Sequence, residues 1–396
     1  AGVLAGKRFG YTYIDGFCVS TDADFVITGE VFPGENKPEG PFGDHLGYYS
    51  LQHPFPVMKV HKVYARKNAI WAFTVVGRPP QEDTSFGQLI HHITGSAVSN
   101  EIPGLKEVHA VDAAGVHPLL LAIGSERYTP FLENKKPAEI LTIANHILGT
   151  GQLSLAKFVW ITAEAKKSKE IELKDNNAEN TQTTGKSVAE FATNKLDVNN
   201  VPDFLQYMLS RMDFSNDLHF YTNTTMDTLD YSGDGLNSGS KLVLATYGDV
   251  RRELATSIPE NIKALNINAQ LVMPGVIAVN AVNTVNTETT YILTIQEKLK
   301  GLGENLLEKQ GVAMIIITED ATWLAAEFNN FIWATFTRTN PAKDIDGVDS
   351  YINNKHWGCK GPLIFDATIK KHHAPAVVKD KEVEKKVTAI LSKYGY

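Results

Sequence analysis

The chain has 396 residues, of which 38 are lysine or arginine and 45 are aspartate or glutamate, so its formal net charge is −7. This length and an apolar fraction of 43% predict about two globular domains, and the mild acidity argues against a general nucleic-acid binder. Two cysteines exclude a disulfide scaffold and are typical of a reducing, cytoplasmic setting. Apolar runs stay shorter than the ~20 residues that a membrane span requires, so we do not expect an integral membrane protein.

The first third of the chain has the pattern of short strands. Aromatic and β-branched runs separated by Gly, Pro and Asp predict strands at 11–19, 24–30, 57–64 and 69–76. Their close spacing favours a barrel or a sandwich over βαβ units. The pattern ends at 77–80, and we expect a helix over about 85–97.

From about residue 106 the pattern changes to alternating strands and helices, which predicts an α/β layer architecture. The expected strands lie at 108–111, 119–123, 157–162, 218–222, 312–318 and 331–337, and the expected helices at 138–148, 188–196, 201–212 and 294–309. The polar stretch 165–185 lacks aromatic residues and predicts a surface insertion. We therefore expect one domain over 1–105 and a second over 106–378.

The C-terminal segment 379–396 predicts an amphipathic helix. Apolar residues recur on one helical face, with Asp380 as the N-cap and Gly395 as the stop. These residues are Val383, Val387, Ile390, Leu391 and Tyr394. Such a face must be buried on the chain's own core or on a second subunit.

The densest chemical signal is the segment 38–49, in which Glu39 and Asp44 are separated by Gly, Pro and Gly. Proline fixes φ and glycine allows close backbone approach, so the segment predicts a stiff loop. Such a loop can hold a carboxyl group in a dry pocket for general acid catalysis. Composition alone favours a surface turn with solvated acids, because surface loops are commonly built in this way.

The order of residues in this loop resembles the signature of the UbiD family of reversible decarboxylases, which act with prenylated FMN. Matching segments occur along nearly the whole chain. They lie at 28–35, 55–57, 75–80, 156–159, 239–241, 335–341 and 365–368. The resemblance is interrupted at 165–185 and is poor at about 250–310.

The resemblance implies a fold and an activity. The fold would be the remainder of a split β-barrel flavin-binding domain, followed by an α/β oligomerisation domain and the C-terminal helix. The activity would be the reversible, non-oxidative decarboxylation of a hydroxybenzoate-type aromatic acid or of an α,β-unsaturated acid. Asp44 would protonate the carbon that loses CO2, and Glu39 would be the first carboxylate of the family's Glu-Arg-Glu/Asp network.

The resemblance also implies weaker assignments. Lys157 matches a family lysine near the cofactor phosphate, and Lys241 is a second candidate for this role. On sequence grounds Lys157 could equally be a strand-edge lysine that reaches solvent, and Lys241 reads more simply as a solvated turn lysine. His45 and Leu89 fall where family members line the substrate pocket, although core packing explains Leu89 at least as well.

Family members carry their catalytic arginine and the Asn, His and Glu ligands of a divalent metal, Mn or Mg, upstream of the signature. We find neither in this sequence, so we expect an N-terminal part to be missing and the chain alone to be a poor decarboxylase. Within the chain we predict no metal site, because His91-His92 lie side by side on a helix and His372-His373 read as a solvated basic corner. We expect Cys18 and Cys359 to be buried thiols.

The implied partners are a small carboxylic acid, a flavin prenyltransferase that supplies the cofactor, and further copies of the chain in a dimer or hexamer. Two alternatives stay open. The chain could be a C-terminal assembly fragment without activity of its own, as the missing residues and the apolar tail helix suggest. It could also be an ordinary FMN oxidoreductase.

Overall fold

The computed structural model describes residues 6–131, 136–163, 196–281 and 290–395. Contacts divide the chain into two compact units. The first unit contains residues 1–44, 48–77 and 374–396, and the second contains 45–47 and 78–373. The main boundary between these units falls at residue 77. The predicted boundary between a flavin-binding domain and a second domain, at residue 105, stays a prediction.

The first unit contains two β-hairpins. Strands β1 (Tyr11–Ile14) and β2 (Phe17–Ser20) pair antiparallel, as do the longer β3 (Phe25–Glu39) and β4 (His53–Ala65). The strand expected over 11–19 is therefore two strands joined by a turn at Asp15 and Gly16, both with positive φ. The described residues of this unit form no closed barrel, so the split barrel stays a prediction.

The strand predicted at 69–76 is wrong. The segment has no regular secondary structure, and its large side chains are exposed, including Trp71 at 65% and Phe73 at 76%. A strand exists only where a neighbour completes its hydrogen-bond ladder, and this segment pairs with no strand in the described part of the unit. The β-type composition alone could not reveal this.

The predicted C-terminal helix is confirmed as α10 (Lys381–Lys393). The Asp380 side chain accepts hydrogen bonds from the backbone N–H groups of Glu382 (2.8 Å) and Val383 (3.2 Å), which caps the helix. Gly395 follows the helix with φ of +81°.

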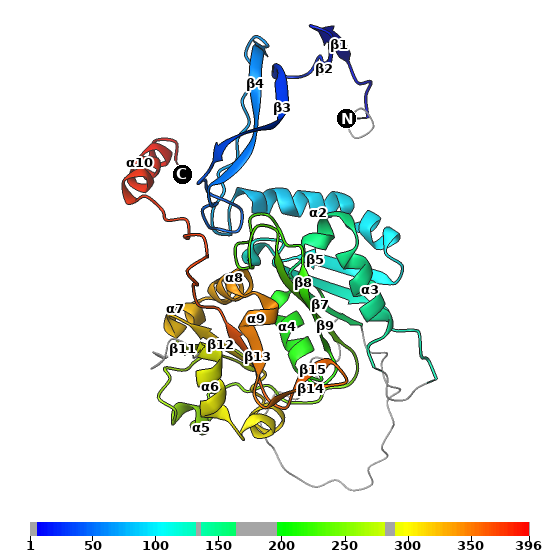
Figure 1. Ribbon diagram of the computed structural model, residues 1–396, viewed down its shortest axis with the longest axis vertical. Coiled ribbons are helices and arrows are strands. Elements are labelled where there is room, and N and C mark those ends of the chain that lie inside the picture. The colour runs from blue at the N-terminus through cyan, green and yellow to red at the C-terminus, as the bar shows by residue number, and fades with distance from the viewer. Residues whose placement is uncertain (1–5, 132–135, 164–195, 282–289, 396) are drawn as a thin grey trace. The chain divides into compact units, whose positions relative to one another are not determined.

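The second unit contains two five-stranded mixed sheets, and each has a parallel centre (Figure 1). The first sheet has the order β5-β6-β7-β9-β8, in which β6, β7 and β9 are parallel and both edge strands are antiparallel. Its strands are β5 (Leu105–Ala110), β6 (Leu119–Gly124), β7 (Phe158–Ala163), β8 (Leu218–Thr224) and β9 (Gly239–Thr246). The helical elements in this part of the chain are α2 (Glu82–Glu101), η1 (Asp112–Ala114), α3 (Glu139–Leu148), η2 (Gly151–Leu155) and α4 (Val201–Leu209). Helix α3 packs Ile143 and Ile147 on this sheet, in one core with Val159 and Ile161 of β7.

The second sheet has the order β10-β11-β12-β16-β13, with β11, β12 and β16 parallel. Its strands are β10 (Gln270–Met273), β11 (Val276–Asn280), β12 (Met314–Thr318), β13 (Ile345–Gly347) and β16 (Leu363–Asp366). The other elements are α5 (Glu260–Lys263), α6 (Tyr291–Leu299), the π-helical η4 (Asn305–Lys309), α7 (Ala321–Ala326), α9 (Pro341–Asp344) and the hairpin β14 (Ser350–Asn353) with β15 (His356–Cys359). The helix expected over 294–309 is therefore two elements, separated near Gly301, which has φ of +77°.

The strand predicted at 331–337 is also wrong, because these residues belong to helix α8 (Phe328–Arg338). The Phe336 ring lies 5.1 Å from that of Phe158 in the first sheet, and Phe158 in turn stacks at 6.1 Å on Phe365 of the second sheet. All residues of α8 from Asn330 to Arg338 are buried. A helix buried on every side needs no polar face, so it lacks the 3.6-residue pattern by which a helix is recognised.

Other predictions on the α/β part divide into two groups. The strands at 108–111, 119–123, 157–162, 218–222 and 312–318 and the helices at 85–97, 138–148 and 201–212 are confirmed within a few residues. The insertion at 165–185 and nearly all of the helix expected at 188–196 lie outside the described residues. Cys359 is buried as expected, whereas Cys18 is exposed, so the prediction for Cys18 is wrong.

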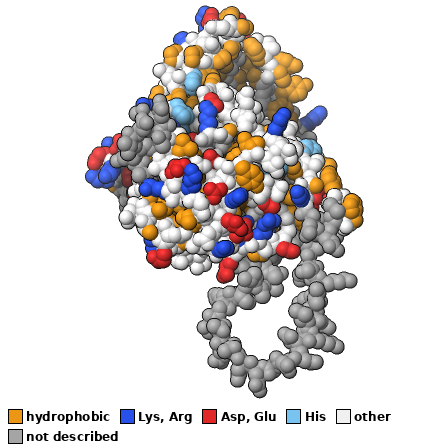
Figure 2. Space-filling view, turned by 60° about the horizontal axis from the view of Figure 1, so that its bottom comes forward, with side chains coloured by type: hydrophobic (Ala, Val, Ile, Leu, Met, Phe, Trp, Pro, Cys, Tyr) orange, Lys and Arg blue, Asp and Glu red, His pale blue; other side chains and the backbone are white. Residues whose placement is uncertain are grey.

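Among the helices of the described residues, none combines the length and the apolar character needed to cross a bilayer. On the face drawn in Figure 2, acidic and basic side chains are interspersed, without a field of one sign. This mixture agrees with the small net charge.

Asp217, directly before β8, predicts a pH dependence of stability. Burial raises the pKa of its carboxyl group to about 7, against hydrogen bonds from Asp213 and Thr246 that lower it. Between pH 4 and 7 the native state therefore keeps a proton on Asp217 that the unfolded chain releases. The contribution of this group to the free energy of unfolding falls as pH rises through this range, by about 4 kcal/mol in total. We expect Asp217→Asn to gain stability relative to the wild type over this range. Urea unfolding at pH 4, 5.5 and 7.5 measures the difference, and a difference independent of pH would contradict the assignment.

Candidate functional site

The acidic loop, residues 39–50, is closed by its own backbone. Phe42 and Ser50 exchange two hydrogen bonds, from Phe42 N–H to Ser50 Oγ (3.0 Å) and from Ser50 N–H to Phe42 O (2.8 Å). The Asp44 N–H donates to Tyr48 O at 3.0 Å. Gly40 has φ of +95°, and a Cβ there would lie 2.8 Å from Ser50 Oγ, so only glycine fits.

The two carboxylates of this loop differ in exposure. Asp44 is 5% exposed, whereas Glu39 lies exposed at the last position of β3, opposite His53. The interpretation as a surface turn with two solvated acids therefore fails for Asp44. The loop thus carries one carboxyl group shielded from water and one exposed to it.

The three residues after Asp44 belong to the second unit and are held tightly there. Trp333 donates its indole N–H to Leu46 O at 2.8 Å. Gly47 has φ of +87°, and a Cβ there would lie 2.7 Å from Arg78 Cα. The Arg78 guanidinium in turn stacks over Trp333, with 4.4 Å to the ring centroid.

These contacts place His45 beside His117 and Asp227. The two imidazole rings lie 5.4 Å apart, and His45 Nε2 lies 3.9 Å from Asp227 Oδ2. His117 Nδ1 makes a short contact with the same oxygen. Burial alone would raise the pKa of Asp227, but the hydrogen bonds from His117 and from the Leu229 N–H outweigh it, so this pKa is lowered. Asp227 is thus an anion between two imidazoles.

A second cluster surrounds Lys157, which directly precedes β7 and is 1% exposed. Its Nζ lies 2.7 Å from Asp230 Oδ2 and donates to Ser232 Oγ (2.7 Å) and Thr337 O (3.4 Å). Burial lowers the pKa of Lys157, and the charge of Asp230 opposes that change. The interpretation of Lys157 as a strand-edge lysine in solvent is therefore wrong.

Lys241 lies next to Lys157, because Phe158 of β7 pairs with Leu242 of β9. It is 4% exposed and donates to Ser154 O, and burial lowers its pKa. The interpretation of Lys241 as a solvated turn lysine is also wrong. The two lysines are neighbours along the backbone, but their ammonium groups have separate partners: Lys157 contacts Asp230, Ser232 and Thr337, whereas Lys241 contacts Ser154.

Leu89 lies on α2. It is 55% exposed, so the core-packing interpretation is wrong, and its predicted role in the substrate pocket stays a prediction. Exposed apolar residues accompany it on the same face: Phe86, Ile90 and Ile93.

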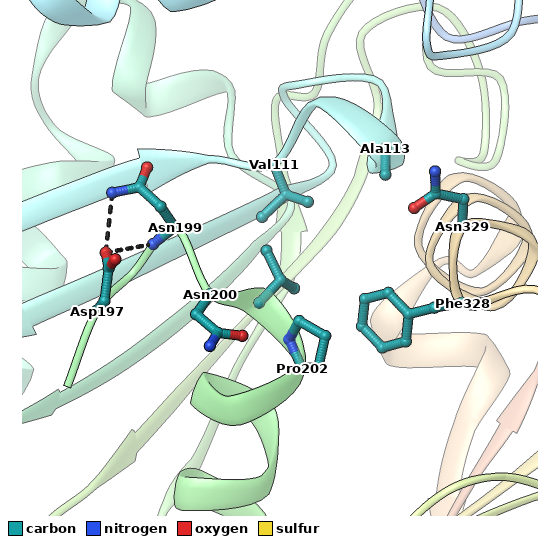
Figure 3. A pocket seen from close by; sticks show the side chains of 9 residues that line it. Val111, Ala113, Asp197, Asn199, Asn200, Pro202, Phe328 and Asn329 are labelled. Carbon is teal, nitrogen blue, oxygen red and sulfur yellow. Dashed lines mark hydrogen bonds between the residues drawn. The ribbon is translucent and has the colours of Figure 1, made fainter. Parts of the chain in front are cut away.

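A cavity of about 430 Å³ opens beside η1 and the start of α8 (Figure 3). Its lining comes from Val111, Ala113, Asp197, Asn199, Asn200, Val201, Pro202, Phe328 and Asn329. Asp197 Oδ1 accepts hydrogen bonds from the Asn199 backbone N–H (2.8 Å) and side-chain amide (2.9 Å). None of the predicted site residues lines this cavity, so we assign it no part in the chemistry.

Sequence reasoning missed His117, Asp227 and Asp230. The acids lie in the segment 227–232, which follows β8 and contains two aspartates, a signal that could have marked it as a polar loop at a strand end. Its partners could not be found in this way, because His117 lies 110 residues before Asp227.

The packing of Gly115 against Leu46 predicts a large effect of a single methyl group. Gly115 has φ of +81°, and a Cβ there would lie 2.6 Å from Leu46 Cδ2 and 3.1 Å from Leu46 Cα. We expect Gly115→Ala to cost about 1–2 kcal/mol for the left-handed backbone and about 1–3 kcal/mol more for the clash. Gly151→Ala is the matched control, because Gly151 has φ of +42° and open space around it. Urea unfolding compares the two variants, and equal losses would show that the turn does not press on Leu46.

Comparison with known proteins identifies the family. The model of the 3-octaprenyl-4-hydroxybenzoate carboxy-lyase Rift-related domain matches residues 1–79, and that of the C-terminal domain of the same enzymes matches 84–178 and 179–246. Together they cover more than half of the chain, which therefore belongs to the UbiD family.

Curated relatives are longer than this chain. An uncharacterized protein of Chlamydia muridarum is 34% identical over 377 residues, which are 94% of this chain and 56% of that protein. A Chlamydia pneumoniae protein, named as a subunit of 4-hydroxybenzoate decarboxylase, is 30% identical over 369 residues, 93% of this chain and 54% of its own length. The chain thus spans about half the length of the curated relatives it matches.

Solved structures give weaker likenesses. The closed form of vanillic acid decarboxylase from Sedimentibacter hydroxybenzoicus is 17% identical, with a TM-score of 0.46 over 65% of this chain and 47% of that one. The apo 3,4-dihydroxybenzoic acid decarboxylase from Klebsiella pneumoniae is 19% identical, with a TM-score of 0.44 over 68% and 52% of the two chains. The family assignment rests on the family models.

Proposed function

We propose that this chain carries the acid–base loop of a reversible, non-oxidative decarboxylase that acts with prenylated FMN. The substrate would be a hydroxybenzoate-type aromatic acid or an α,β-unsaturated carboxylic acid. The observation that carries the proposal is the acidic loop, which lies inside the stretch matched by the family model and combines a buried Asp44 with an exposed Glu39.

In this proposal Asp44 is the proton donor. A carboxyl group that is 5% exposed and held in a closed loop is shielded from bulk water, so in this proposal its proton is directed at the bound substrate. Asp44 gives this proton to the carbon from which CO2 has left, and Glu39 returns a proton from water to the loop. Prenylated FMN, when bound, supplies an electron sink for the charge left on that carbon.

Lys157 and Lys241 are the proposed contacts to the cofactor phosphate, and they fit it unequally. The ammonium of Lys157 already faces Asp230, Ser232 and a carbonyl oxygen, so a phosphate would have to displace one of them. The described contact of Lys241 is a single carbonyl oxygen, which makes Lys241 the better fit.

His45 and Leu89 are the proposed substrate-pocket residues. For the divalent Mn or Mg of the family, the resemblance places the ligands outside this chain, so we derive no step through it.

The working enzyme, as we propose it, is a cytoplasmic dimer or hexamer that receives its cofactor from a flavin prenyltransferase. The test is an assay of the complete protein with prenylated FMN against a panel of hydroxybenzoates and cinnamate-type acids. We expect CO2 release without consumption of reduced nicotinamide. Nicotinamide oxidation without CO2 release would instead support the FMN oxidoreductase.

One observation favours assembly as a second function of this chain. The apolar face of α10 is exposed, with Val383, Val387, Ile390, Leu391 and Tyr394 between 46% and 75% exposed. Burying such a face on a second copy is favourable at about 25 cal/mol per Å². We expect deletion of 381–396 to reduce the particle size measured by light scattering. An unchanged size would remove the tail helix from the interface.

A further inference from the structure

The cluster of His45, His117 and Asp227 has the composition of a metal site. The three side chains come from separate segments: the residues after the acidic loop, the turn before β6 and the loop after β8. One ligand atom of each residue lies within 4.8 Å of the other two. A metal ion placed among them would contact all three after small side-chain adjustments.

The ligand types indicate which metal fits. Two imidazoles and one carboxylate suit Zn²⁺ and similar first-row divalent ions, whereas Mg²⁺ and Ca²⁺ prefer sites built from oxygen alone. Three protein ligands leave at least one coordination position for water or another small ligand. The side chains of His45, His117 and Asp227 are 20%, 24% and 10% exposed, so the cluster is partly buried, and His45 Nε2 itself is shielded from solvent.

The surroundings orient the ligands. Asp227 Oδ1 accepts a hydrogen bond from the Leu229 N–H at 2.9 Å, which leaves Oδ2 directed at the histidines. The His117 N–H donates to Gly115 O at 2.9 Å, and the His117 carbonyl accepts from the Lys157 N–H at 3.2 Å. The contact to Asp227 orients a ligand side chain as outer contacts do in metal sites, and the two His117 contacts hold the backbone that carries the imidazole.

The backbone next to His117 is strained. Val116 has φ of +71°, a left-handed conformation that a β-branched residue rarely adopts and that costs about 1–3 kcal/mol. The neighbouring Gly115 packs on Leu46, so the same turn that strains Val116 brings His117 to His45. Strain of this kind persists where the surrounding structure enforces a particular side-chain placement.

We propose that His45, His117 and Asp227 bind one divalent transition-metal ion of the Zn²⁺ type. This site lies within the chain and is distinct from the metal that the family resemblance places upstream. The proposal does not rest on the decarboxylase assignment, because the ligand set follows from the arrangement of these three residues alone.

The test is Zn²⁺ titration of the chelator-treated 396-residue chain, followed by calorimetry. We expect one equivalent to bind, and His117→Ala and Asp227→Asn each to weaken binding by at least about 100-fold, more than the loss of an outer contact produces. Asp227→Asn preserves the shape of the side chain and the contact to Leu229, so a loss of binding in this variant does not reflect misfolding. An excess of Mg²⁺ is expected to leave Zn²⁺ binding unchanged.

His219→Ala is the matched control. The His219 and His356 rings also lie 5.4 Å apart, but no carboxylate joins them in a candidate metal group of the described residues. We expect this variant to bind Zn²⁺ like the wild type. The proposal is overturned if the wild type binds no Zn²⁺, if both ligand variants bind as well as the wild type, or if the control loses binding equally.

Discussion

Replacing Asp44 with asparagine is expected to lower the decarboxylation turnover of the complete, cofactor-loaded protein by about 10²–10⁴-fold, the usual contribution of a general acid. Asparagine has nearly the same shape but no acidic proton to give. We expect the loop to keep its fold, because asparagine retains the shape of the side chain and the backbone N–H of residue 44 still donates to Tyr48 O.

Glu35→Gln is the control for this variant, because Glu35 is an exposed acid on β3, the strand that leads into the acidic loop. We expect it to turn over like the wild type. If Asp44→Asn also kept full turnover, Asp44 would have no role as the acid, whereas equal losses in both variants would indicate a general effect of removing charge from this hairpin.

The second large effect is expected at the Lys157–Asp230 pair, which is almost completely buried, with side chains 2% and 4% exposed. Lys157→Met leaves a buried carboxylate without its cation, and this should lower the free energy of unfolding by about 3–5 kcal/mol. Adding Asp230→Asn removes the uncompensated charge while an amide oxygen can still accept from Ser232, so the double variant should recover much of the loss.

Urea unfolding of the single and double variants measures this coupling. Lys263→Met is the control, because Lys263 pairs with Glu260 at the surface, with side chains 53% and 88% exposed. We expect no measurable loss there. Additive losses at Lys157 and Asp230 would contradict a direct ion pair between them.

Where the local sequence pattern and the tertiary environment of an element agree, the sequence was sufficient to predict that element. Helix α10 shows this, because one apolar face, an Asp380 cap and a terminal glycine all indicate the same element. Helix α8 shows the reverse. Its burial between two sheets removes the polar face, so a short apolar run reads as a strand.

Sequence reasoning found the acidic loop of the candidate site, because its order of residues is distinctive over a short stretch. The burial of Lys157 and its partners could not be predicted from the sequence. Its partner Ser232 lies 75 residues away, and a single lysine before a strand gives no indication of burial. The His45–His117–Asp227 cluster was missed for the same reason. Its members share no local motif and meet only through the tight turn at Gly115 and the contacts that hold Leu46.

The most direct test of the central claim is a crystal structure of the complete protein with prenylated FMN and a substrate analogue. We expect a carboxyl oxygen of Asp44 to lie about 3–3.5 Å from the carbon that bears the substrate carboxylate, the separation from which a proton can be transferred. A structure in which Asp44 faces bulk water, or in which another side chain occupies that position, would contradict the account.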